Sequence, residues 1–177
     1  MVEPMTLQHF YARYVRSLLT EIAEAIADLS EDELNRRPHA DSNSIGFDAW
    51  HVARTADNLV SFAFERARPL WLSEGLDERW GLPKVDQGTG MPPADAHALR
   101  FPPVAELSGY VTAVRDAIAP RIEAMTDDYL ASMTTIRPHG ELTKAQVIGQ
   151  VIINHGNNHL GMISTARTLL GKPGLGF

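Results

Sequence analysis

Hydrophobic side chains recur every three or four residues along four long stretches of the chain. This is the period of an amphipathic α-helix, which buries one face and leaves the other in water. Pro120 interrupts the third stretch without changing its phase, so a kink is expected there and not an end. The predicted helices run from about 6 to 29, from after 44 to near 69, from after 103 to 125, and from 143 to 170.

Residues that commonly cap helices stand where these helices begin. Ser44 precedes the second helix and is an N-cap candidate. Thr143 is followed three residues later by Gln146, which predicts a capping box at the start of the fourth helix. Ser30 and Glu33 have the same spacing and predict a short helical turn between the first two helices. The caps therefore support the boundaries that the hydrophobic period indicates.

The segment 68–102 loses this period and is rich in proline, glycine and aromatic side chains. A connector of this length is typical of a crossover or a lid, and we expect its Trp71, Trp80 and Phe101 to anchor it to the helices. It is long enough to travel the length of a bundle, so the second and third helices can run parallel. No stretch shows a convincing strand pattern. The sequence therefore predicts an all-α fold, a four-helix bundle with up-down-down-up topology, in one domain over residues 1–177.

Composition narrows the classes of function. The net charge of -6 at pH 7, from 22 acidic and 16 basic residues, argues against a nucleic-acid partner. The uncharged run 145–166 contains several glutamines and asparagines that a bilayer would not accept, so no membrane partner is expected. The first residues lack an export pattern, and we expect a cytoplasmic protein. The chain has no cysteine, which excludes disulfides and thiolate metal sites and leaves histidine as the candidate ligand.

His155 and His159 lie one turn apart on the most apolar face of the fourth predicted helix. A buried imidazole is unfavourable unless its nitrogens find partners. Two imidazoles at this spacing can share one metal ion, which satisfies a nitrogen of each ring. The alternative is a pair of core histidines that hydrogen-bond to the backbone or to the neighbouring asparagines. We favour the metal, because two rings in register are harder to explain as core residues than one.

His51 is the only histidine of the second predicted helix. A metal ion in the core of a bundle needs a further ligand from a facing helix. His51 lies at the edge of the apolar stripe, where its ring could lean into a cleft between helices or stay half-exposed to solvent. The other histidines stand near the termini or in loops and are expected at the surface: His9, His39, His97 and His139.

Three short motifs and one arginine carry a family resemblance. They read N-S-I at 43–45, A-W-H at 49–51 and N-H-G-N-N-H-L-G at 154–161, with Arg167 beyond. Their order and spacing, over nearly the whole chain, resemble the DinB/YfiT-like superfamily of bacterial metalloenzymes. The resemblance implies an up-down-down-up bundle, often a homodimer, in which His51, His155 and His159 bind a divalent metal ion.

Three neutral imidazoles would leave the charge of the ion uncompensated and a coordination position open, which is typical of a catalytic site. Zinc, nickel, iron and manganese all accept imidazole. Met162 stands where relatives commonly have glutamine, a departure that concerns the surroundings of the ligands. Asp48, Asn58 and Asn158 neighbour the histidines on their helices and could orient them, although solvated flank positions are the default expectation.

Several other metal sites do not fit this sequence. No glutamate stands between His155 and His159, which disfavours an H-E-x-x-H metalloprotease. Ile152 occupies the position where a di-iron carboxylate bundle has an acidic residue. A c-type haem attachment needs cysteines that the chain lacks, and a pair of histidines one turn apart suits a small ion better than haem.

Three functions follow from these observations. The first is a metal-dependent enzyme that acts on a small-molecule substrate. Here the resemblance implies transfer or isomerisation with a low-molecular-weight thiol, and hydrolysis is the neighbouring option. The second is a non-catalytic metal-binding bundle of the stress-response kind, in which the ion only stabilises the fold. The third is an interaction bundle with ordinary core histidines.

Overall fold

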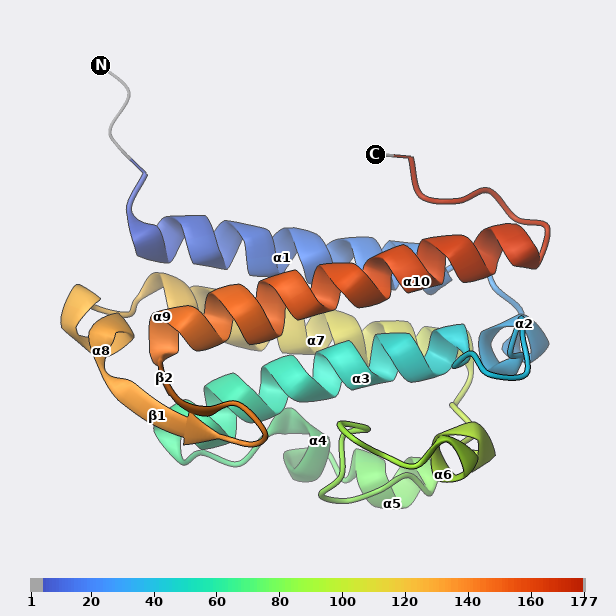
Figure 1. Cartoon of the computed structure of the whole chain (residues 1–177), viewed down its shortest axis with the longest axis horizontal. Coiled ribbons are helices and arrows are strands. Elements are labelled where there is room, and N and C mark those ends of the chain that lie inside the picture. Colours follow the sequence, from blue (N-terminus) through green and yellow to red (C-terminus); the bar gives the residue numbers. More distant parts are fainter. Residues whose placement is uncertain (1–4, 177) are drawn as a thin grey trace.

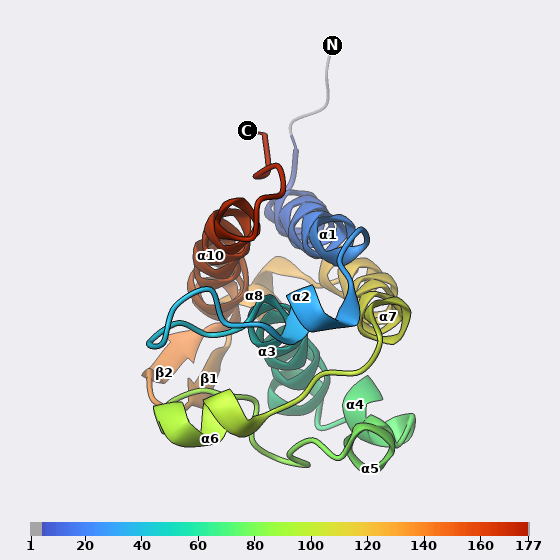
Figure 2. The ribbon, with the colours of Figure 1, turned by 90° about the vertical axis from the view of Figure 1, so that its right-hand side faces the viewer.

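The computed structural model describes residues 5–176, most of which are helical. Four long helical segments lie side by side around a hydrophobic core (Figure 1, Figure 2). Two of them are single α-helices, whereas the other two change between α-helical and π-helical hydrogen bonding along their length. The segments are α1 (Leu7–Ile26), α3 (Ile45–Asp57) with η1 (Asn58–Phe64), α7 (Val104–Glu123), and α9 (Lys144–Gln146) with η2 (Val147–Asn154) and α10 (His155–Leu169).

The chain runs in one direction through α1 and α10 and in the opposite direction through α3 and α7 (Figure 1). Helix α1 packs mainly against α7, and α3 packs against both α7 and α10. Helix α7 continues through Pro120, as the unbroken phase of its apolar positions predicts. The mostly helical fold expected from the sequence is confirmed.

Capping interactions at the helix starts also match the prediction. The Ser44 hydroxyl accepts a hydrogen bond from the backbone N–H of Phe47, at 3.1 Å, at the start of α3. Thr143 and Gln146 form the expected capping box before α9. The second predicted box begins the short helix α2 (Glu31–Asn35). These local interactions fix where α3 and the α9–α10 segment begin, and with them the positions of the histidines.

A small antiparallel hairpin precedes α9, whereas the sequence predicts no strand, so the hairpin corrects that prediction. It pairs β1 (Met133–Ile136) with β2 (Gly140–Thr143) and follows the short helix α8 (Asp127–Ala131). Each strand has four residues, and only Ile136 is buried. Such a short strand has too few positions for the alternation on which recognition from sequence depends.

The connector between η1 and α7 covers the side of α3 that faces away from α1 (Figure 2). Trp71 is fully buried and Phe101 nearly so, and both rings lie close to Trp50 of α3. Trp80 is partly buried and packs edge-on against Trp71. These contacts confirm that the aromatic residues anchor the connector. Its three short helices are α4 (Leu70–Ser73), α5 (Leu76–Trp80) and α6 (Pro93–Ala98).

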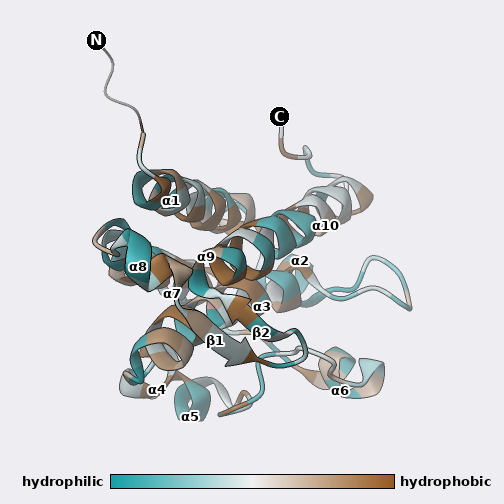
Figure 3. Ribbon diagram, turned by 60° about the vertical axis from the view of Figure 1, so that its left-hand side comes forward, coloured by the Kyte–Doolittle hydropathy of each residue, from teal (hydrophilic) through white to brown (hydrophobic). Residues whose placement is uncertain are grey.

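Along the long helices, hydrophobic residues recur about once per turn between hydrophilic ones, as expected for helices that bury one face (Figure 3). Within residues 5–176, no helix has both the length and the apolar character needed to cross a membrane. The uncharged run 145–166 instead forms part of the α9–α10 segment of the bundle. The cytoplasmic location stays a prediction from the sequence.

Candidate metal centre

Helices α3 and α10 pack against each other and bring His51, His155 and His159 together. Their close approach depends on Gly156, beside the first histidine of α10. A Cβ atom on Gly156 would lie 2.4 Å from the Leu18 side chain of α1 and 3.3 Å from that of Val52 in α3. A side chain at this position would therefore require the Leu18 side chain to move and would tighten the contact with Val52.

The three rings meet through the same type of atom. The Nε2 atom of His155 lies 3.1 Å from Nε2 of His51 and 3.0 Å from Nε2 of His159. The ring centroids are separated by 4.6 to 5.0 Å. Of the three side chains, His51 is almost fully buried, with 4% of its surface exposed, and the other two are partly buried.

The opposite nitrogens of two rings are held by acceptors. The Nδ1 atom of His51 donates to the backbone carbonyl of Gln87, which can only accept. The Nδ1 atom of His159 donates to the Asp48 carboxylate at 2.9 Å. A neutral imidazole carries one ring proton, so these bonds leave the Nε2 atoms of His51 and His159 with free lone pairs.

This donor set fits a metal ion. Two lone pairs face His155, and its Nε2 atom could donate a single proton to only one of them. A cation bound by all three Nε2 atoms would satisfy every lone pair. Zinc lies about 2.0 to 2.1 Å from imidazole nitrogen, which places neighbouring ligand nitrogens roughly 3 to 3.5 Å apart. Two of the three separations, 3.0 and 3.1 Å, match that spacing, and all three ligand atoms lie within 4.8 Å of one another.

Burial favours the neutral, ligand-competent form of two of the rings, His51 and His155. It lowers the pKa of His51 to about 4, and the proximity of His159 and His155 adds to the shift, while the Gln87 carbonyl opposes it. Burial also lowers the pKa of His155, with a further contribution from His159. The pKa of Asp48 is raised by burial, although its hydrogen bond to His159 counteracts this.

Other residues of the site differ from what the sequence indicates. Asp48 is 3% exposed and bonds His159, so its default reading as a solvated flank residue is wrong. Asn158 is exposed and Asn58 partly buried, and the described part of the chain gives neither a hydrogen bond to the histidines. The Gln87 carbonyl has no sequence signal, because every residue carries one. The sequence does show the glycine that follows, Gly88. Its φ of +95° favours glycine, and a Cβ there would lie 3.1 Å from Nδ1 of His51.

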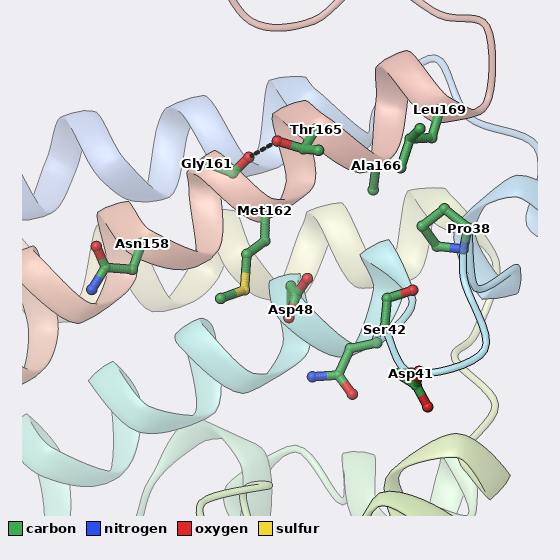
Figure 4. A pocket seen from close by; sticks show the side chains of 11 residues that line it. Pro38, Asp41, Ser42, Asp48, Asn158, Gly161, Met162, Thr165, Ala166 and Leu169 are labelled. Atoms are coloured by element: carbon green, nitrogen blue, oxygen red, sulfur yellow. Dashed lines mark hydrogen bonds between the residues drawn. The ribbon is translucent and has the colours of Figure 1, made fainter.

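The histidines open onto a cavity of about 410 Å³. Phe47 and Met91 contribute apolar surface to it, and Thr89 and His97 contribute polar groups. A second hollow of about 690 Å³ lies along α10 and shares Asp48 with the site (Figure 4). Both volumes fall in the range of about 300 to 1,000 Å³ that is usual for small-molecule sites.

Comparison with known proteins identifies the family. A family model described as the DinB superfamily matches residues 14–163, which include all three histidines. The chain belongs to the DinB superfamily. The family assignment that the sequence motifs suggested is thereby confirmed. No curated protein matches the chain.

The fold of this DinB-superfamily protein is similar to that of a solved structure, described as "Crystal structure of the conserved protein of locus from Enterococcus faecalis". The TM-score is 0.82 at 22% sequence identity, and the match covers 96% of this chain and 100% of the other. At this identity the similarity shows the fold alone.

Proposed function

We propose that this protein is a metal-dependent enzyme whose divalent ion is held by His51, His155 and His159. The observation that carries the proposal is the convergence of three Nε2 atoms, two of them on rings whose Nδ1 atoms bond the Gln87 carbonyl and Asp48. The cavity beside them gives a small molecule access to the same point. Zinc, nickel, iron and manganese are all compatible with three imidazoles.

A divalent ion in this site would supply positive charge that stabilises a substrate thiolate or activates water for hydrolysis. We infer transfer or isomerisation with a low-molecular-weight thiol as the reaction class. In a transfer, the sulfur forms a bond to an electrophilic carbon of the second reactant while the bond from that carbon to its leaving group breaks. The leaving group departs with that electron pair, and the thiol proton passes to it or to solvent. No carboxylate stands between His155 and His159, which makes the H-E-x-x-H type of peptide hydrolysis a poor fit.

The protein's own groups orient the ligands and shape the substrate site. Asp48 holds the His159 ring and brings one negative charge close to the ion. Phe47 stacks on His51, with ring centroids 5.8 Å apart, and excludes water from one side of that ligand. We propose that this arrangement belongs to a single domain with up-down-down-up topology that forms a homodimer.

The test is metal analysis of protein purified without a histidine tag. Wild-type protein is expected to contain about one divalent ion per chain and to turn over members of a panel of thiol conjugates. The His155→Ala variant should lose both. His9→Ala is the matched control, because His9 is exposed on α1 and should leave both unchanged.

Two outcomes would contradict the proposal. Wild-type protein without a stoichiometric ion, even after incubation with zinc, nickel, iron and manganese, would favour an interaction bundle with core histidines. A bound ion whose removal lowers the melting temperature, combined with no turnover of thiol conjugates or hydrolysable esters, would favour the non-catalytic stress-response bundle.

A further inference from the structure

A small cavity of about 80 Å³ lies on one side of His155, which, with Thr89, also borders the cavity that opens onto the Nε2 atoms. Residues from four parts of the fold surround it: Thr55 of α3, Gln87 of the connector, the turn of the hairpin, and Gln150 of η2. We refer to it as the His155 chamber. Its volume is well above the roughly 10 to 15 Å³ that a single buried water molecule needs.

Unpaired buried polar atoms are concentrated at this chamber. Five buried side-chain nitrogen and oxygen atoms in the described part of the chain have no hydrogen-bond partner. Three of the five belong to residues that line the chamber: Thr55 Oγ1, Gln87 Oε1 and His155 Nδ1. The Val151 carbonyl, one turn before His155, also acts on this ring but does not reach Nδ1 in hydrogen-bond geometry. Buried polar atoms in folded proteins are nearly always paired with protein or ordered water, so this clustering requires an explanation.

The three atoms complement one small hydrogen-bonding molecule. With its Nε2 atom directed at the metal centre, a neutral His155 ring carries its proton on Nδ1 and is a donor. Gln87 Oε1 can only accept, and the Thr55 hydroxyl can do either. A water molecule can accept from the ring and donate to the two oxygens, and two to four polar partners are what a buried water requires.

We propose that the His155 chamber is a built hydration site, and that Thr55 and Gln87 are positioning residues that fix the ring of His155 through the water it holds. This inference rests on the proposed function in one respect, the role of His155 as a metal ligand. Each of the three rings then has an acceptor for its Nδ1 proton: the Gln87 carbonyl for His51, Asp48 for His159, and water for His155. Gln87 serves two ligands, one through its backbone and one through its side chain.

The inference is tested by removing the chamber's oxygens while keeping its shape. Thr55→Val removes the hydroxyl, and Gln87→Met removes Oε1 but keeps the backbone carbonyl that holds His51. Zinc affinity, measured by competition with a chelator, is expected to fall about tenfold in each variant, since changes in groups that orient ligands typically cost 10- to 100-fold. Thr55→Ser keeps a hydroxyl and should restore the affinity, and Thr168→Val on the exposed side of α10 should leave it unchanged.

A second measurement separates positioning from general loss of structure. Nitrogen-15 NMR of the histidine rings in zinc-bound protein is expected to show a slowly exchanging Nδ1 proton on His155, which exchanges faster in Thr55→Val and Gln87→Met. A crystal structure should show density within hydrogen-bond distance of the three atoms. Unchanged zinc affinity and unchanged ring signals in both variants would overturn the inference. If wild-type protein bound no divalent ion, the proposed function would fail, and density in the chamber of the crystal structure would still decide whether it holds water.

Discussion

Two clusters of buried polar side chains lie along α3, and they are satisfied in different ways. Asp57 is 0% exposed, and its two oxygens accept from the backbone N–H groups of Leu70 and Trp71 and from the hydroxyls of Ser61 and Tyr110. In the histidine cluster, lone pairs of like atoms face one another instead.

The difference separates a structural role from a binding role. Around Asp57 each acceptor meets a donor of the protein itself, and the result ties the connector to α3. The histidine cluster is complete only when a positive charge joins it. The predictions below test this contrast, because the two clusters should respond in opposite ways to truncation and to metal.

The largest effect is expected from Asp57→Ala. This change leaves two backbone and two hydroxyl donors without their acceptor in a closed site, and each unsatisfied group costs about 1 to 3 kcal/mol. We expect a loss of about 3 to 5 kcal/mol in the free energy of unfolding, measured with urea on metal-free protein. Asp116→Ala, at an exposed carboxylate, should change it by less than about 0.5 kcal/mol. If His155→Ala lowered the free energy of unfolding of metal-free protein by a comparable amount, the two clusters would not differ in their structural role.

The second effect concerns pH. The folded pKa of His51 is about 4 against an ordinary value of 6.5, so the unfolded chain takes up a proton at a higher pH than the folded chain does. Metal-free wild-type protein should therefore lose stability relative to His51→Gln as the pH falls from 6.5 towards 4, by at most about 3 kcal/mol. Urea unfolding at several pH values in this range gives the difference. Parallel curves for the two proteins would contradict it.

The third effect separates the clusters by metal. Zinc at about 100 times its dissociation constant should raise the free energy of unfolding of wild-type protein by about 2.7 kcal/mol. The same zinc should also stabilise the weakened Asp57→Ala protein but leave His155→Ala unchanged. Thermal unfolding with and without a chelator measures both. Equal stabilisation of all three proteins would mean that the ion binds elsewhere.

The smallest effect is expected from Asp48→Asn, which keeps the shape of the side chain but replaces the charged acceptor of His159. Zinc affinity should fall about 10- to 100-fold. Asp41→Asn, at an exposed carboxylate that lines the hollow along α10 together with Asp48, is the matched control and should change affinity little. An equal loss in both variants would assign the effect to overall charge and not to the orientation of His159.

Much of this arrangement can be predicted from the sequence, because it depends on local pattern. The period of apolar residues gives the four helices, and Ser44 and Thr143 give two of their starts. Helix geometry alone places His155 and His159 on one face. These features need no knowledge of distant contacts.

The remaining features depend on contacts that a single helix does not encode. His51 lies at the edge of the apolar stripe of α3, yet it is buried, because the connector covers that side of the helix. The carbonyl of Gln87 reaches His51 only through the path of the connector. The burial of Asp48 follows from the packing of α3 against α10. Sequence pattern therefore finds the ligands but not the groups that orient them.

The absence of a side chain at Gly156 has a consequence for how this protein can vary. The residue sits between Leu18 and Val52, so even one added methyl group would overlap the Leu18 side chain unless that side chain moved. His51 lies on α3, on one side of this helix contact, and His155 and His159 lie on α10, on the other side. Mutational libraries that randomise position 156 should thus return almost only glycine under selection for metal, although the residue itself touches no ion.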